Sequence, residues 1–332
     1  MFLALFLLLL VTDPRQAVSL LQEGLRALQH GELTQAKEAL EQASRLDPNN
    51  AYAWASLAET YRRLKNPQQA SAAAQTAENV GSEDPVVTHA LAIFYTESGD
   101  PARAFAFAQT AEKQQSSPAN RDLLAQTAFN YAQVLFRKQD FTRAADTLSS
   151  AIQSNPGNTQ LTLALGVARY GQRRFEDSVL QFLKVIQIDP AIEQPYVFLG
   201  RMLDQAGTHL GQITSAYETW VSRAPHNAKA QLLLAKALLA SDAQSEKAEA
   251  LLRRSIALNP NDWEAHYELG VLLANKHQYP QAAVELTRSV EIEPNQPEPH
   301  YHLARVYDRL GQPDRAKAER ALHERLTAAT PH

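Results

Sequence analysis

The chain has 332 residues, a formal net charge of −4 and a sequence pI near 6.2, and it contains no run rich in Lys and Arg. This balance argues against a nucleic-acid-binding protein, which usually carries a basic stripe. Cysteine is absent, so neither disulfides nor thiolate metal sites are available.

Residues 1–16 differ from the rest of the chain. Phe2 to Val11 is an unbroken apolar run with the length of a signal-peptide core, too short for the roughly 20 residues that span a bilayer. We interpret it as an export signal or a truncated membrane anchor, although no Lys or Arg precedes it and VTDPRQA offers no small-x-small cleavage site. The alternative is a first helix packed on the remainder.

The apolar run also sets the expected location. We expect the chain to be exported, either periplasmic or secreted, or to associate with a membrane through residues 2–11. A cytoplasmic location is the remaining alternative. Asp13-Pro14 then predicts an N-cap and a first helical turn.

From about residue 17 one pattern repeats along the chain. A small residue recurs in the first helix of each repeat, in steps of 34 or 35 residues with one step of 40: Gly24, Ala58, Ala92, Ala132, Gly166, Gly200, Ala235, Gly270 and Ala304. A second small residue recurs in the following helix, except at Ile213: Ala36, Ala70, Ala104, Ala144, Ser178, Ala248, Ala282 and Ala316. Most repeats end at a Pro that cannot continue the helix, as at Pro48 and Pro294.

The segment Trp263 to Gln296 shows the repeat most clearly. Its first half predicts one amphipathic helix and its second half, beginning near Pro280, another. Gly270 and Ala282 are small where two helices need to pack closely. Such a pair leaves an apolar face uncovered, so it needs neighbours stacked on it.

These markers resemble the tetratricopeptide repeat (TPR), which has a period of 34 residues. The second repeat carries Trp54, Leu57, Ala58 and Tyr61 at the expected places. The resemblance covers about residues 17–328 and implies an all-α fold, an α-solenoid of about nine TPR-like helix-turn-helix repeats. A solenoid of this kind leaves no room for a catalytic domain.

Three places depart from the period. Residues 119–124 are inserted before the fourth repeat, which predicts a first helix more than a turn longer than the others, with Asn120 able to cap it. We expect a bend here, dividing repeats 1–3 (residues 17–118) from repeats 4–9 (residues 119–328). Single extra residues near 207–211 and 241–245 are expected in turns, and Arg320 marks an uncovered last helix.

No motif points to chemistry. Ten histidines invite a metal interpretation, but His300 and His302 lie on different faces of a helix, and His266 and His300 share a repeat position that is usually structural. No nucleophile elbow, zinc-binding helix or phosphate-binding Gly loop occurs. We therefore expect no catalytic residues, no metal and no cofactor, and the chain is not predicted to be an enzyme.

The resemblance implies a binding function, because in this family the first helices of the repeats line a concave face. By repeat position, the candidate partner-binding residues are Phe129, Asn130, Gln133, Arg137, Tyr170, Gln194, Phe198 and Arg201. Aromatic, amide and Arg side chains suit recognition of a peptide. The alternative is a solvated surface in which Phe129 and Phe198 serve packing.

The predicted function is therefore a protein-interaction scaffold that binds a peptide or protein partner on the concave face. A Lys/Asn clamp for a partner's C-terminal carboxylate, known in some family members, is absent from the matching positions, such as Ala55 and Glu59. The alternative function is an accessory or regulatory subunit of an envelope enzyme or a secretion or assembly complex.

Overall fold

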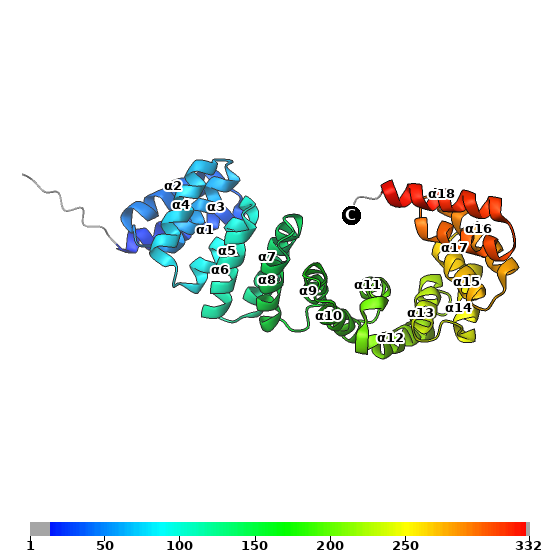
Figure 1. Cartoon of the computed structure of the whole chain (residues 1–332). Helices are drawn as coiled ribbons and strands as arrows, with labels where there is room; N and C mark the ends of the chain where they lie inside the picture. The colour runs from blue at the N-terminus through cyan, green and yellow to red at the C-terminus, as the bar shows by residue number, and fades with distance from the viewer. Residues whose placement is uncertain (1–13, 330–332) are drawn as a thin grey trace, which may run out of the picture. The chain divides into compact units, whose positions relative to one another are not determined.

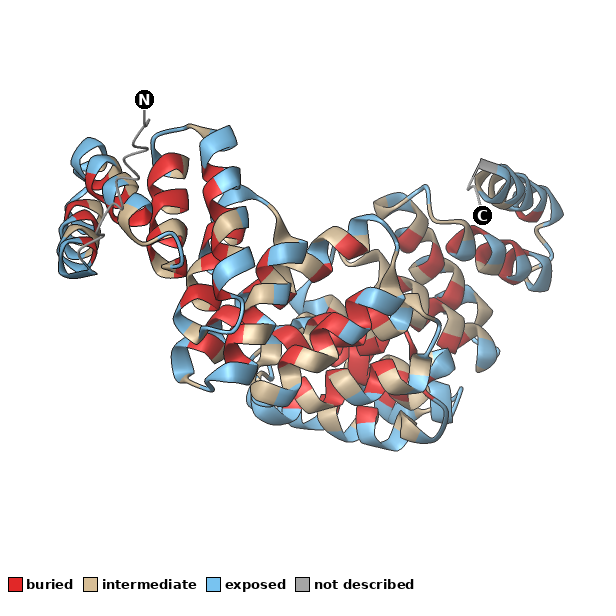
Figure 2. Cartoon of the chain, turned by 90° about the vertical axis from the view of Figure 1, so that its left-hand side faces the viewer, coloured by how far each residue is buried: buried red, intermediate tan, exposed pale blue. Residues whose placement is uncertain are grey.

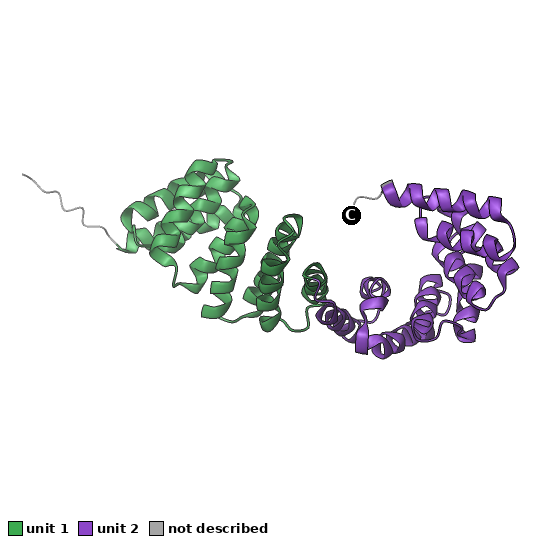
Figure 3. Ribbon diagram, in the orientation of Figure 1, with its two compact units in different colours: residues 1–172 green, residues 173–332 purple. Residues whose placement is uncertain are grey.

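The computed structural model describes residues 14–329, and within that range the chain forms helices and turns with no strand (Figure 1). The apolar run at residues 2–11 and the predicted N-cap Asp13 lie outside the described residues. The chain divides after Gln172 into an N-terminal unit and a C-terminal unit (Figure 3). The expected blocks, residues 17–118 and 119–328, divide it elsewhere, and a bend at the insertion stays a prediction.

The N-terminal unit consists of nine helices between residues 14 and 172. They are α1 (Pro14–His30), α2 (Leu33–Leu46), α3 (Ala51–Arg63), α4 (Pro67–Gly81), α5 (Pro85–Ser98), α6 (Pro101–Gln114), α7 (Pro118–Arg137), α8 (Phe141–Ser154) and α9 (Thr159–Gly171). Odd-numbered helices here are the first, or A, helices of their repeats, and even-numbered helices are the second, or B, helices.

The C-terminal unit covers residues 173–329 of the described chain. Its helices are α10 (Phe175–Ile188), α11 (Gln194–Gly200), α12 (Leu210–Arg223), α13 (Ala228–Ser241), α14 (Glu246–Leu258), α15 (Trp263–Asn275), α16 (Tyr279–Ile292), α17 (Pro297–Arg309) and α18 (Pro313–Ala329), with two 3-10 turns, η1 (Leu203–Gln205) and η2 (Gly207–His209). The predicted all-α architecture of helix pairs is confirmed.

The small residues lie where helices A and B of one repeat come closest. A Cβ added to Gly270 would lie 2.6 Å from Leu286 Cγ, and one added to Gly24 would lie 2.6 Å from Leu40 Cγ. Real Cβ atoms essentially never approach so closely, so a glycine is needed opposite a leucine at these crossings. Figure 2 shows the result as stripes of buried positions along the helices.

Most turns between helices A and B place one residue in the left-handed backbone region, and the turn at residues 242–245 is the exception. Gly31, Gly99 and Gly311 supply it at φ 68° to 78°, where glycine has no steric penalty. Lys65 and Gln139 adopt it at φ 58° and 57° without that advantage. The turn geometry is therefore set by the repeat and not by the residue that occupies it.

A second recurring contact closes the start of the A helices. A residue in the first turn of helix A donates a side-chain hydrogen bond to the carbonyl of the Pro six residues earlier. The bonds are Trp54 to Pro48 (2.9 Å), Tyr196 to Pro190 (3.3 Å), Gln231 to Pro225 (3.0 Å), His266 to Pro260 (3.1 Å) and His300 to Pro294 (3.0 Å). This bond ties each of these helices to the Pro turn before it.

The insertion before the fourth repeat lengthens helix A as predicted, since α7 has 20 residues where α3, α15 and α17 each have 13. The predicted cap is wrong. Ser117 caps α7, accepting a hydrogen bond from the Asn120 N–H at 3.1 Å. Asn120 is buried inside the helix, and its amide donates to the carbonyls of Ala111 and Gln115 at 3.2 and 2.7 Å.

The sixth repeat departs from the expected helix pair. Its helix A, α11, ends at Gly200 after seven residues and continues as 3-10 turns. The hydroxyl of Tyr217 on α12 donates to the Tyr196 carbonyl at 2.8 Å, within the α11 backbone ladder. Trp220 of the same helix stacks on Tyr196 with ring centroids 4.4 Å apart. Large aromatic side chains of α12 thus pack against the first turn of α11.

The other two departures follow the sequence prediction. Four residues separate α13 from α14, against three between α15 and α16, so the extra residue near 241–245 lies in a turn. Arg320 on the last helix is solvent-exposed and pairs with Asp308 of α17 at 2.7 Å. A polar residue at this position is consistent with a face that no further repeat covers in the described chain.

The crossing glycine gives a stability prediction. We expect Gly270→Leu to lower the free energy of unfolding by roughly 1–3 kcal/mol, because the added side chain overlaps Leu286. Gly211→Leu is the matched control, since Gly211 is exposed and has nothing within 4 Å of an added Cβ. Denaturant midpoints measure both. Equal midpoints for the two variants would contradict the packing role of Gly270.

Candidate functional site: the A-helix surface

A groove of about 280 Å³ lies over the A helices α1, α3 and α5 of the N-terminal unit. Its lining is mostly apolar along the two outer helices and more polar along α3. The lining residues are Leu25, Leu28, Gln29, Tyr52, Ala55, Ser56, Glu59, Arg63, Ala90, Ile93 and Phe94. Ile93 is 41% exposed, and Val18 on α1 and Val86 on α5 are more exposed still. Aliphatic side chains therefore meet solvent on this surface.

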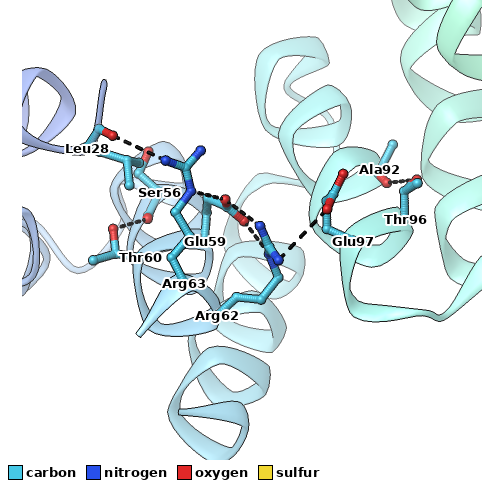
Figure 4. A network of polar contacts seen from close by, with 9 residues as sticks. All are labelled: Leu28, Ser56, Glu59, Thr60, Arg62, Arg63, Ala92, Thr96 and Glu97. Atoms are coloured by element: carbon cyan, nitrogen blue, oxygen red, sulfur yellow. Dashed lines mark hydrogen bonds and ion pairs between the residues drawn. The ribbon is translucent and has the colours of Figure 1, made fainter. Parts of the chain in front are cut away.

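The charges in the groove are already paired. Arg62 Nε donates to Glu59 Oε2 at 2.7 Å, and Arg63 Nε donates to Glu59 Oε1 at 2.6 Å (Figure 4). Arg62 Nη1 also lies 3.9 Å from Glu97 Oε2 on α5, and Arg63 Nη1 donates to the Leu28 carbonyl on α1 at 3.4 Å. The network therefore links three successive A helices.

The same network fixes the protonation state of Glu59. Burial raises the pKa of this carboxyl, but the hydrogen bonds and charges of Arg62 and Arg63 outweigh burial, so its pKa lies below the ordinary value. Glu59 is ionised at neutral pH and its two oxygens accept from two guanidinium groups. The groove thus offers a ligand apolar walls and a charge pair that is satisfied without it.

The A helices of the C-terminal unit carry a different surface. Lys236 on α13 pairs with Glu264 on α15, Lys229 Nζ lies 3.0 Å from Glu264 Oε2, and Lys236 Nζ lies 3.7 Å from Glu268 Oε1. Burial raises the pKa of Glu264, but the two lysines lower it to below its usual range. For Glu268 burial dominates and its pKa is raised.

Beside these charges lies an aromatic strip on α15 and α17. His302 stands edge-on to Tyr267 and Tyr301, with ring centroids 5.6 and 5.2 Å apart, and Arg305 lies 5.6 Å from the Tyr301 ring centroid. Tyr301 is 42% exposed. Burial and the neighbouring Arg305 lower the pKa of His302, so this imidazole is neutral at pH 7.

Comparisons with known proteins fit this architecture. Family models described as tetratricopeptide repeat match residues 27–93, 129–191, 251–283 and 285–318, together more than half of the chain. The chain belongs to the tetratricopeptide repeat family. No curated protein matches the sequence.

Several solved TPR-type structures are similar at low identity. TTC0263, a thermophilic TPR protein of Thermus thermophilus, is 23% identical over 52% of this chain and 98% of its own, with a TM-score of 0.43. MamA from Desulfovibrio magneticus RS-1 is 16% identical over 63% of this chain and 97% of its own, with a TM-score of 0.38. Yeast Tom70 is 11% identical over 96% of this chain and 77% of its own, with a TM-score of 0.43. With TM-scores below 0.5, these likenesses carry no weight for function.

TPR families are generally non-enzymatic and bind protein or peptide partners, so family membership supports a protein-interaction scaffold. Among residues 14–329, no three His, Asp or Glu side chains are grouped so that they could hold a metal ion. The helices of that range include none with the length and apolar character needed to cross a bilayer.

The sequence-predicted partner residues fall in both units. In the N-terminal unit, Asn130, Gln133 and Arg137 lie three or four residues apart along α7 and therefore share a face. Gln133 and Arg137 are exposed and Asn130 is half-buried, whereas Phe129 packs against the core around Ala128 and Ala132. Tyr170 on α9 is 45% exposed.

In the C-terminal unit, Gln194 and Arg201 are exposed at the two ends of α11. Phe198 is half-buried and stacks on Phe182 of α10, with ring centroids 5.0 Å apart and an interplanar angle of 4°. Phe198 thus contributes to packing, the alternative that the sequence left open. A partner-binding role for these residues stays a prediction.

Sequence reasoning did not identify the groove on α1, α3 and α5. It considered Ala55, Glu59 and Ile93 only as positions of a missing carboxylate clamp. The available indication was an apolar residue at the same A-helix surface position in the first and third repeats, Leu25 and Ile93, with Glu59 at that position in the second. His266 and His300 were correctly predicted to be structural, at 7% and 4% exposure.

Proposed function

We propose that this TPR protein is a scaffold that binds an apolar, uncharged segment of a protein partner along the A helices of its N-terminal unit. The observation that carries the proposal is the groove lined by Leu25, Leu28 and Ile93. Exposed aliphatic side chains gathered in a groove gain free energy when a partner removes them from water. Family membership supports a binding role of this kind.

The electrostatics of the groove favour an uncharged ligand. Glu59 already accepts hydrogen bonds from Arg62 and Arg63, and Arg62 lies near Glu97. A charged ligand side chain would have to break this network or be desolvated beside a satisfied pair, and both cost free energy. An aliphatic side chain between Leu28 and Ile93 meets neither cost.

Further along the same unit, the candidate surface of α7 is consistent with this function. Asn130, Gln133 and Arg137 follow each other on one face and make no hydrogen bond or ion pair within the described chain. Amide side chains both donate and accept, so they can pair with the backbone of an extended segment. We propose that α7 contributes polar contacts and that the groove contributes the apolar anchor.

A second function, that of an accessory or regulatory subunit of an envelope enzyme or assembly complex, is favoured by one sequence feature. The apolar run Phe2 to Val11 has the length of a signal-peptide core. A scaffold placed at the envelope would regulate catalysis performed by its partner. This proposal is compatible with the groove and adds a location to it.

The groove is tested by placing a charged side chain in its apolar lining. We expect Ile93→Asp to reduce binding of uncharged apolar peptides on a peptide array at least tenfold, because the carboxylate is desolvated against Leu28. Val80→Asp is the matched control, since Val80 on the B helix α4 is also 41% exposed. If both variants bind the same peptides as strongly as the parent, the groove is not the binding surface.

The α7 contribution is tested separately. Asn130→Ala with Gln133→Ala is expected to weaken capture of the same peptides by several-fold, while helix content and melting temperature stay nearly unchanged, because neither side chain fills the core. Glu38→Ala, an exposed change on the B helix α2, is the control. Undiminished capture by the double variant would exclude α7 from the interface and leave the groove proposal standing.

The location is tested with a reporter fused after Ala17. We expect the reporter to be exported or to fractionate with membranes because residues 2–11 are entirely apolar. Replacing Leu7 and Leu8 with Asp and Lys should return it to the cytosol. A parent fusion found wholly in the cytosol would contradict the proposed location, and the mature N-terminus distinguishes cleavage from anchoring.

A further inference from the structure

The last two repeats share one contact between helix A and helix B. His266 Nδ1 on α15 lies 2.7 Å from Glu285 Oε2 on α16, and His300 Nδ1 on α17 lies 2.6 Å from Glu319 Oε2 on α18. Both pairs are separated by 19 residues, and the second stands 34 residues after the first. The recurrence of the same geometry in consecutive repeats makes it a property of this end of the array.

Each imidazole faces a second acceptor. Nε2 of His266 lies 3.1 Å from the Pro260 carbonyl and Nε2 of His300 lies 3.0 Å from the Pro294 carbonyl. A neutral imidazole carries one N–H, but a carbonyl and an ionised carboxylate both need a donor. The contacts are therefore fully satisfied only when the histidine carries two protons or the carboxyl carries one.

We propose that the His266–Glu285 pair forms a pH-sensitive clasp that holds helix A to helix B in the eighth repeat as an imidazolium–carboxylate bond. When the imidazole loses a proton, one of its two nitrogens is left bare and faces the carboxylate or the Pro260 carbonyl. Two acceptors with no proton between them repel each other, so the helix pair loosens.

The surroundings of His266 support this protonation state. Around His266 the charged groups are Glu285, Arg288 and Glu291 on α16 and Arg315 on α18, with the Tyr307 hydroxyl of α17 in the same groove. Burial lowers the pKa of His266, but the bonds to Glu285 and Pro260 outweigh it, and its pKa is raised.

His300 makes the same two contacts in different surroundings. Glu319 and the Pro294 carbonyl occupy the places of Glu285 and Pro260, while Leu322 stands at the position of Arg288 and Arg325 at that of Glu291. His302, two residues away, lies on another face of α17.

The sign of the pH effect follows from linkage. Because the folded pKa of His266 lies above its unfolded value of about 6.5, the clasp stabilises the repeat fully below pH 6.5 and loses this contribution as pH rises through the higher folded pKa. His302 acts in the opposite direction, since its lowered pKa affects stability only on the acid side. The two effects therefore occupy separate pH ranges.

The seventh repeat supplies the matched control. Gln231 donates its side-chain amide to the Pro225 carbonyl at 3.0 Å, the bond that His266 and His300 make in the next two repeats. His266→Gln with His300→Gln therefore retains the Pro bond and removes the titrating group. Glu285→Gln with Glu319→Gln keeps a hydrogen bond, since an amide N–H donates to a neutral Nδ1, and removes the charge.

The experiment is performed on the full chain. Long-range ¹H–¹⁵N correlation spectra from pH 5.5 to 9 report the protonation of each histidine nitrogen, and hydrogen exchange at pH 6 and 9, corrected for intrinsic rates, reports opening of α15 to α18. We expect His266 to stay doubly protonated above pH 6.5. Protection of α16 should fall several-fold more between pH 6 and 9 in the parent than in either double variant.

Two results would overturn the proposal. One is a His266 that titrates at or below 6.5 and is a neutral Nε2–H tautomer at pH 7. The other is an equal loss of protection with pH in the parent and in the Gln variants. If the histidine variants do not fold, the glutamate variants carry the same comparison, because their expected pKa for His266 is lower and their exchange should be flat with pH.

Discussion

The close approach of two helices at a small residue is the constraint on which the rest of this structure depends. Gly24 lies against Leu40 and Gly270 against Leu286, at distances that exclude a Cβ. At the equivalent place in the second repeat, Ala58 is paired by position with the smaller Ala74, and both are fully buried. The residue on helix A stays small at these crossings while its partner on helix B varies, since Ala132 of the fourth repeat stands by position opposite Leu148.

Apart from the helix crossings, the interior side and the outward side of a repeat have different chemistry. Interior positions are filled mostly by Ala and Leu. The outward-facing side chains of the A helices do not pack in the core, so they can differ between the two units. In the N-terminal unit that surface is a largely apolar groove whose charged lining residues, Glu59 and Arg63, are hydrogen-bonded to each other. In the C-terminal unit it is a set of Lys–Glu pairs beside Tyr267 and Tyr301. Any selectivity for a partner must arise from these differences, since the scaffold beneath is the same.

The sequence predicted what is periodic and failed where the structure depends on a single contact between distant residues. The crossings, the Pro turns and the long α7 follow from spacing. The short α11 does not, and in that repeat the Tyr217 hydroxyl donates to the Tyr196 carbonyl, a contact between residues 21 apart that spacing does not indicate. The cap of α7 is Ser117 and not Asn120 because the Asn side chain is bound to the carbonyls that end α6. The groove was missed because it forms from three helices, none of which stands out on its own.

The hydrogen bond to the Pro carbonyl shows how one structural requirement admits several chemistries. Indole, phenol, amide and imidazole groups all donate to that carbonyl, at Trp54, Tyr196, Gln231 and the two histidines. The side chains of Trp54 and Tyr196 have no second polar atom. The second polar atom of Gln231 is its amide oxygen, which does not ionise and is buried without a hydrogen-bond partner. Imidazole alone has a second nitrogen that can gain a proton near neutrality. A Glu 19 residues later supplies the acceptor for that proton. Thus a position that serves packing at Trp54, Tyr196 and Gln231 becomes titratable at His266 while the contact to the Pro carbonyl is kept.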